Sequence, residues 1–249
     1  MKKYIPNALT LTNLFCGCVA VVFAVHTNFV FAAIFVFLGI FFDFFDGFFA
    51  RKFNVQGELG LQLDSLADMV TSGLVPGIVM FKLLELTNSS WSNSATDSLV
   101  NSVFSQITDA GFLPFLGFAI TLASAYRLAK FNIDTEQQSF FKGLPTPANT
   151  LLIMSLPLIM EFQNNDFINA IILNKWFLIV LTLVSCYILN SDVKLFALKF
   201  KNYGFKDNVV RYIFILLCVV LLVVLQFASI PVIILLYIIM SILDNLTSK

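Results

Sequence analysis

The sequence has few charged residues. Asp, Glu, Lys and Arg make up only 12% of its 249 residues, whereas soluble domains contain about 25%. Hydrophobic residues account for 59%, phenylalanine alone occurs 29 times, and the mean hydropathy is +0.89. This composition excludes an ordinary soluble globule and predicts an integral membrane protein that contacts the lipid bilayer. The formal net charge is zero, so the total charge does not indicate an acidic partner, and no nucleic acid is expected.

Residues that commonly hold zinc, form disulfides or act as general bases are also scarce. The four cysteines, Cys16, Cys18, Cys186 and Cys218, lie in apolar stretches, and their spacing fits neither a zinc site nor a redox motif. We interpret them as small core residues. The single histidine, His26, is expected on the side of the membrane opposite the acidic residues described below, which argues against histidine-based catalysis.

The apolar stretches predict one domain, an all-α bundle of about eight transmembrane helices, because a span needs about 20 apolar residues. His26-Thr27-Asn28 divides the first long stretch, Pro145 and Pro147 should open the fifth span, and that span should end before Glu161. The uncharged stretch 212–243 is too long for one span and is expected to turn near Ser229-Ile230-Pro231. The predicted core spans are 8–26, 29–50, 60–83, 111–130, 145–160 and 174–190, and an extra hairpin is predicted at about 209–246. Residues 85–109 are expected to form a polar loop.

The distribution of basic residues predicts which ends of the spans face the cytoplasm. If both termini are cytoplasmic, every Lys and Arg lies inside except Lys82 and Lys175. The positive-inside rule favours this orientation. It places the cytoplasmic ends of spans two and three together, and four aspartates lie at those ends.

The four aspartates, Asp43, Asp46, Asp64 and Asp68, follow helical spacing. Residues three and four apart share a helix face, so Asp43 and Asp46 lie on one face of span two, and Asp64 and Asp68 on one face of span three. A short turn joins the spans, so the two faces can converge. Unpaired buried carboxylates cost several kcal/mol each, and divalent cations would offset this cost. Oxygen-only ligands favour Mg²⁺ or Mn²⁺, and two ions could share the site.

Small residues and one arginine accompany the acids. Gly47, Ala50 and Gly60 leave room beside the helix backbone, and Arg51 can bind a phosphate through its planar fork. Together with the acids, these residues predict a site for a metal-bound pyrophosphate. The alternative is a set of acids scattered at an aqueous interface, which would not explain the matched helical faces.

The pattern Asp43-x2-Asp46-Gly47-x2-Ala50-Arg51-x8-Gly60-x3-Asp64-x3-Asp68 resembles, at every position, the signature of the CDP-alcohol phosphotransferases. The resemblance implies a membrane enzyme that transfers a phosphatidyl-type group from a CDP-alcohol to a second alcohol and releases CMP. It also implies a homodimer. By resemblance, Asp43, Asp46, Asp64 and Asp68 would be metal ligands and Asp68 would also be the catalytic base. The nucleotide and phosphate would lie against Gly47, Ala50, Arg51 and Gly60.

Two further stretches bear on the acceptor alcohol. Ile5–Ala24 and Tyr126–Ala148 are similar to segments of phosphatidylserine synthases, although Lys130 stands where arginine is more usual. This resemblance implies CDP-diacylglycerol and L-serine as substrates, in a prokaryotic inner or plasma membrane with the active site on the cytoplasmic side. Arg127, Lys130 and Asn13 are predicted to bind the acceptor. Alternatively, Arg127 and Lys130 only anchor a helix end at the lipid headgroups, and Asn13 only packs between helices.

Three other functions remain open. The same chemistry could use glycerol 3-phosphate or an inositol phosphate, although such acceptors would require more clustered cations than the inner loops offer. A divalent-cation transporter would also place acids in membrane helices, but here the acids cluster at one end of two spans. A non-catalytic membrane scaffold would leave Arg51 and the glycines without a role.

Overall fold

The helical class predicted from the sequence is confirmed. A computed structural model describes residues 4–88, 111–133, 141–163, 165–195 and 209–247. Within these ranges the regular structure is helical, except for a short ribbon in which two two-residue strands pair antiparallel. Most of the polar loop predicted at 85–109 lies outside the described residues. The elements, in chain order, are α1 (Tyr4–Val25), α2 (Phe29–Lys52), α3 (Glu58–Asp68), the π-helix η1 (Met69–Leu74), α4 (Val75–Asn88), η3 (Leu113–Gly117), α6 (Phe118–Ile133), β1 (Phe141–Lys142), α7 (Thr146–Gln163), α8 (Asp166–Ile172), α9 (Lys175–Asn190), β2 (Lys194–Leu195), α10 (Val209–Leu225), η5 (Gln226–Ala228) and α11 (Ser229–Thr247).

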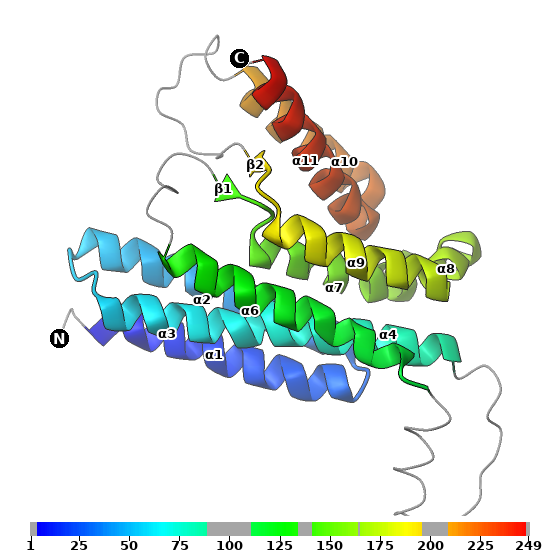
Figure 1. The fold of residues 1–249 in the computed structure, drawn as a ribbon, viewed down its shortest axis with the longest axis horizontal. Coiled ribbons are helices and arrows are strands. Elements are labelled where there is room, and N and C mark those ends of the chain that lie inside the picture. The colour runs from blue at the N-terminus through cyan, green and yellow to red at the C-terminus, as the bar shows by residue number, and fades with distance from the viewer. Residues whose placement is uncertain (1–3, 89–110, 134–140, 164, 196–208, 248–249) are drawn as a thin grey trace, which may run out of the picture.

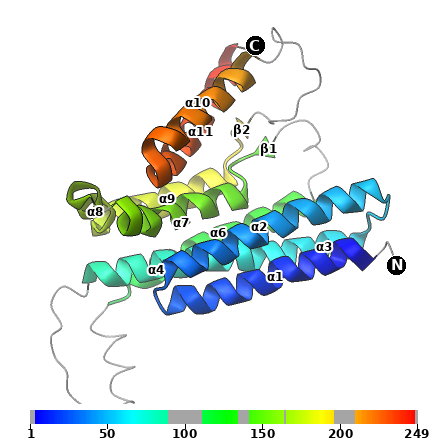
Figure 2. The same cartoon turned by 180° about the vertical axis from the view of Figure 1, so that it is seen from behind.

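The helices form an elongated bundle with a hairpin leaning away from it (Figure 1). Helices α1, α2 and α6 run lengthwise beside the continuous rod made by α3, η1 and α4, and α7 and α9 cover one side of this group (Figure 2). Helices α10 and α11 pack on each other, and α11 also contacts α7 and β2. The end of α2 and the start of α3 therefore lie together at one end of the bundle, next to the start of α1.

Close packing of α1 and α2 follows from small side chains. Ala20, Ala24, Ala32 and Ala33 are at most 2% exposed, and small residues allow helix backbones to approach each other in membranes. The turn between the two helices is closed by Asn28, whose side chain accepts a hydrogen bond from the backbone N–H of Phe31. These features fix how α2 lies against α1, and so where its polar face points.

Four helical stretches of the described residues are long and apolar enough to cross a membrane: 4–25, 29–52, 58–87 and 211–243. The bent pair α8 and α9, which meet at 60°, would add a fifth if it forms one span. The structure thus shows four or five membrane-capable helices, and the count of eight spans and the cytoplasmic termini stay predictions.

Some predicted boundaries differ from the structure. The C-terminal stretch turns at η5, slightly before the predicted Ser229, and Gln226 there has a positive φ of 48°. Helix α7 continues to Gln163, beyond the predicted end before Glu161. Helix α8 was not predicted. Asn165 caps the start of α8, and Asn174 caps the start of α9. These two caps divide the segment before the predicted sixth span into a short helix and a long one.

Candidate active site

The structure brings the acidic faces of α2 and α3 together. One carboxylate oxygen from each of Asp43, Asp46 and Asp64 lies within 4.8 Å of the others. The tight turn after α2 makes this possible: the backbone N–H of Val55 bonds to the carbonyl of Ala50 at 3.0 Å, and Asn54 adopts a positive φ of 52°. The convergence predicted from helical spacing is therefore present.

Phenylalanines occupy the opposite face of α2. Phe41, Phe44 and Phe48 are 42–65% exposed, whereas Asp46 is only 5% exposed and Asp43 is half-buried. Helical periodicity separates the two sets, because the acids face the neighbouring helices and the aromatic rings face outward. The acids in this phenylalanine-rich stretch are thus kept away from the exposed aromatic surface of α2.

Helix α1 supplies hydrogen bonds to two of the acids. The hydroxyl of Thr10 donates to Asp46 Oδ2 at 2.6 Å, and the amide Nδ2 of Asn13 donates to Asp68 Oδ1 at 3.2 Å. Asp68 lies one turn beyond Asp64, at the start of η1, and is close enough to interact electrostatically with the other three acids. All four predicted aspartates therefore belong to one cluster that α1, α2 and α3 build together.

The cluster fits a hard divalent cation. Asp64 Oδ1 is buried and receives no hydrogen bond from the described residues, so it is a carboxylate oxygen that lacks a partner. The nearby ligand atoms are carboxylate oxygens, which Mg²⁺ and Mn²⁺ prefer over nitrogen or sulfur. Asp43, Asp46 and Asp64 could hold such an ion, and Asp68 is placed to join them.

A cavity of about 550 Å³ opens beside the acids. The predicted nucleotide and phosphate residues Gly47, Ala50, Arg51 and Gly60 all line it, together with Asp46 and Asp64. Gly47 leaves the space open in front of Arg51: a Cβ atom built on Gly47 would lie 3.8 Å from both terminal nitrogens of the guanidinium. The cavity is therefore lined by acids, small residues and a cation, as a bound pyrophosphate requires.

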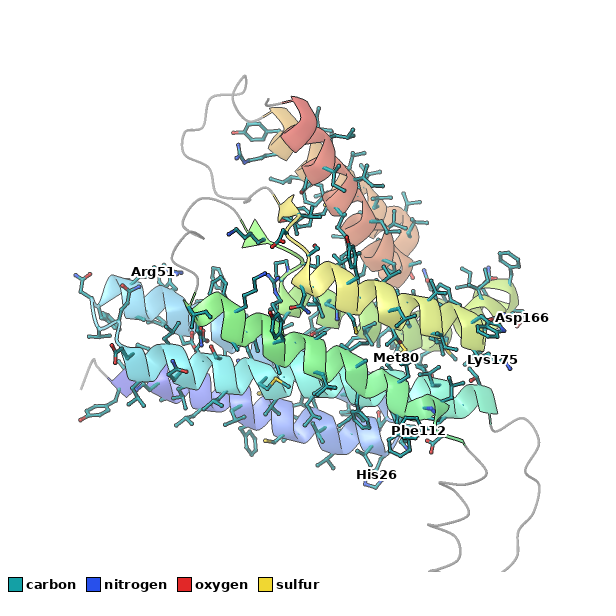
Figure 3. All side chains as sticks on the ribbon, viewed as in Figure 1. His26, Arg51, Met80, Phe112, Asp166 and Lys175 are labelled. Atoms are coloured by element: carbon teal, nitrogen blue, oxygen red, sulfur yellow. The ribbon has the colours of Figure 1, made fainter. Side chains whose placement is uncertain are left out.

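Some residues of this cavity were not predicted from the sequence. Pro6 and Asn7, from the first turns of α1, and Gln56, from the turn after α2, also line it. The sequence offered no signal for them, because no spacing rule connects the first turns of α1 to a motif that begins at Asp43. Arg51 marks this end of the bundle, whereas His26 and Lys175 lie at the opposite end (Figure 3).

The predicted acceptor residues lie in different places. Asn13 is in the acidic cluster, but Arg127 and Lys130 do not line the 550 Å³ cavity. They line a separate cavity of only about 10 Å³, about the volume that one water needs. Lys130 forms an ion pair with Asp192, with 3.4 Å between Lys130 Nζ and Asp192 Oδ1. The guanidinium of Arg127 is buried and donates to the backbone carbonyls of Lys142, Gly143 and Leu189.

The end of α6 still reaches the acidic cluster through one contact. The side chains of Asn132 and Ser65 are hydrogen-bonded, with 2.9 Å between Asn132 Nδ2 and Ser65 Oγ. Ser65 lies in α3 between Asp64 and Asp68. The segment that carries Arg127 and Lys130 is thus attached to the helix that carries two of the acids.

Comparison with known proteins agrees with this geometry. Residues 3–188 match the family model described as CDP-alcohol phosphatidyltransferase; the match ends before the C-terminal hairpin. A CDP-diacylglycerol–serine O-phosphatidyltransferase of Bacillus subtilis is 31% identical over 173 residues, which cover 68% of this chain and 81% of that protein.

Two further relatives are matched over little more than half of their length. A Helicobacter pylori (strain J99) protein with the same name is 30% identical over 60% of this chain and 55% of its own. An archaetidylserine synthase of Methanothermobacter thermautotrophicus is 26% identical over 61% of this chain and 56% of its own. The family model covers well over half of the chain and matches the helices that build the acidic cluster, so the protein belongs to the CDP-alcohol phosphatidyltransferase family.

Proposed function

We propose that the protein transfers the phosphatidyl group of CDP-diacylglycerol to the hydroxyl of L-serine and releases CMP. The observation that carries this proposal is the convergence of four aspartates beside a cavity lined by Arg51 and small residues. The names of the bacterial relatives support serine as the acceptor. The cytoplasmic position of the site and a homodimeric assembly belong to the same proposal.

The cavity is proposed to hold the nucleotide and its pyrophosphate, while the acyl chains stay in the lipid. Arg51 would pair with phosphate oxygens through its fork. Gly47, Ala50 and Gly60 would let the ligand approach the helix backbones. A divalent metal held by Asp43, Asp46, Asp64 and Asp68 would supply Lewis-acid stabilisation of the negative charge that develops on the phosphate oxygens.

Asp68 is proposed as the general base. Its carboxylate would take the proton from the serine hydroxyl as that oxygen bonds to the phosphorus next to diacylglycerol. The bond from this phosphorus to the CMP oxygen would break, and CMP would leave with its electron pair. Of the three residues predicted to bind the acceptor, Lys130 is proposed to pair with the serine carboxylate. Arg127 is already bound to three backbone carbonyls and Asn13 to Asp68.

Purified protein incubated with labelled CDP-diacylglycerol and separate acceptors would test the proposal. Serine should give labelled phosphatidylserine and CMP, and glycerol 3-phosphate or an inositol phosphate should give much less product. The Asp43→Asn variant, which removes one acid without changing its size, is the matched control for contaminating activity. Product with glycerol 3-phosphate alone would refute the choice of serine and leave the family assignment intact.

A further inference from the structure

We propose that Asn13 and Thr71 are positioning residues for Asp68: Asn13 fixes the direction of the carboxylate, and Thr71, from the π-helix, fixes Asn13. The proposal rests on the function proposed above, because it takes Asp68 to be the proton acceptor. It gives the π-helix η1 a role in the reaction although none of η1's own side chains lines the active-site cavity.

The three residues form a continuous set of contacts between α1, α3 and η1. Asn13 is fully buried, and its Nδ2 donates to Asp68 Oδ1 at 3.2 Å. Thr71 is also fully buried, and its hydroxyl donates to the backbone carbonyl of Asn13 at 3.2 Å. Asp68 is the last residue of α3 and directly precedes η1, and Thr71 lies in the first turn of η1, so two bonds attach Asn13 to the start of the π-helix. π-Helical turns inside α-helices are rare overall, and those that occur often lie at functional sites.

The orientation of the Asn13 amide follows from its partner. A carboxylate only accepts hydrogen bonds, so the amide nitrogen must face Asp68. The amide oxygen then points away, is buried and receives no hydrogen bond from the described residues. A buried polar atom without a partner is unfavourable, so helix packing alone would favour an apolar residue at this position. The bond to Asp68 is the contact that accounts for an asparagine here.

Two glycines allow α1, α2 and η1 to approach one another closely at this point. A Cβ atom on Gly39 of α2 would lie 2.7 Å from Thr71 Cγ2 and 2.8 Å from Asn13 Oδ1. A Cβ atom on Gly17 of α1 would overlap the hydroxyl of Thr71. Larger residues would separate α1 from η1 and break the bond from Thr71. The close approach needed for positioning is therefore built into both neighbouring helices.

Thr71→Val tests the proposal, because it removes a hydroxyl that touches neither substrate nor aspartate and nearly preserves the shape. Thr150→Val is the matched control: the fully buried Thr150 donates to the carbonyl of Ser72, in the same π-helix, and of Thr146, but has no bond to Asn13. Thr71→Ser keeps the hydroxyl. The measurements are kcat, both KM values, CMP affinity by calorimetry, and thermal stability in detergent.

We expect Thr71→Val and Asn13→Ala to lower kcat by about 10- to 100-fold, as small displacements of a reacting group do. Both KM values and the CMP affinity should change little, and Thr71→Ser should restore kcat. Thr150→Val should lower thermal stability about as much as Thr71→Val while leaving kcat near that of the wild type. That contrast separates positioning from a loss of folding.

Two outcomes would overturn the proposal. If Thr71→Val and Thr150→Val change kcat equally, the hydroxyl of Thr71 only supports packing. If Asn13→Ala raises the serine KM and leaves kcat unchanged, Asn13 binds the acceptor and does not position Asp68. Asp68→Asn distinguishes this failure from that of the proposed function. If Asp68→Asn is active, Asp68 is not the base and the proposed mechanism fails. If Asp68→Asn is inactive and Thr71→Val has a normal kcat, only the positioning role is refuted.

Discussion

Replacing Arg127 with alanine should destabilise the protein more than it weakens serine binding. Arg127 is only 9% exposed. Its Nη1 donates to the carbonyls of Lys142 at 2.8 Å and Leu189 at 2.6 Å, and its Nη2 donates to the carbonyl of Gly143 at 3.2 Å. The carbonyls of Lys142 and Gly143 belong to β1 and the turn that leads to α7, and that of Leu189 to the end of α9, while Arg127 itself lies in α6. One buried cation thus joins α6, the end of α9 and the segment that leads into α7.

The magnitude follows from the three bonds. A hydrogen bond to a charged group contributes about 1.5–3 kcal/mol, but neighbouring bonds are not additive and water can enter the space that alanine leaves. We therefore expect a loss of about 3–5 kcal/mol in the free energy of unfolding, comparable to removing one partner of a buried ion pair. For a chain of this size that corresponds to a fall in Tm on the order of 10 °C.

Thermal unfolding in detergent and serine kinetics, measured on the same preparations, would check this prediction. Arg127→Lys keeps the charge but loses the fork, so its stability should be intermediate. Gly143→Ala is a second control, because Gly143 has a positive φ of 71° and a Cβ there would lie 2.6 Å from the Leu189 carbonyl and 2.9 Å from Arg127 Nη1. It should destabilise the same junction without removing a charge.

A different result would favour the acceptor role. If Arg127 holds the serine carboxylate, Arg127→Ala should raise the serine KM by roughly 10- to 150-fold, the equivalent of one charge-assisted contact, with an unchanged Tm. An unchanged Tm together with a raised serine KM would refute the structural role described above. A raised KM for CDP-diacylglycerol alone would place Arg127 in the lipid-phosphate site.

Two other predictions concern the acids. Treatment with EDTA should abolish activity, and added Mg²⁺ or Mn²⁺ should restore it, because the ligand set is made of carboxylates; full turnover in a metal-free preparation would contradict the metal site. Asp68→Asn should lower turnover by about 10²- to 10⁴-fold, the usual contribution of a positioned base, while CDP-diacylglycerol binding falls much less. A variant with near wild-type turnover would exclude Asp68 as the base, and one that cannot bind the nucleotide would make it chiefly a ligand.

The sequence predicts the acidic cluster well because the cluster depends on local rules. Helical periodicity places Asp43 and Asp46 on one face of α2, and a short turn brings α3 back beside it. Contacts made by backbone carbonyls are different. The sequence does not reveal that the Arg127 side chain would bind the carbonyls of β1, the turn after it and the end of α9, because any residue type supplies a carbonyl. The charge of Arg127 was therefore interpreted either as an acceptor-binding group or as an anchor at the lipid headgroups, and its contacts with backbone carbonyls were missed.

The π-helix was missed for a related reason. Residues 60–83 read as one helical span, although Thr71, Ser72 and Gly73 interrupt its apolar pattern. The extra residue in the turn depends on how η1 packs against α1 and α6, which is set by tertiary contacts such as the bond from Thr71 to Asn13. Likewise, the sequence does not reveal that Asn13 contacts Asp68, so it predicts only acceptor binding for Asn13.

The arrangement explains how a membrane helix can carry acids at all. Asp46 is nearly buried, but the Thr10 hydroxyl donates to it, and Asp68 receives a bond from Asn13. These neutral donors offset part of the cost of burying carboxylates and add no positive charge that would compete with a cation. A salt bridge would have stabilised the acids more and left less attraction for a metal. Among the described residues, the ion pairs lie elsewhere, at Lys82–Glu85 and Lys130–Asp192. The polar residues of α1 therefore hold the acids in place for the cation on which the proposed chemistry depends.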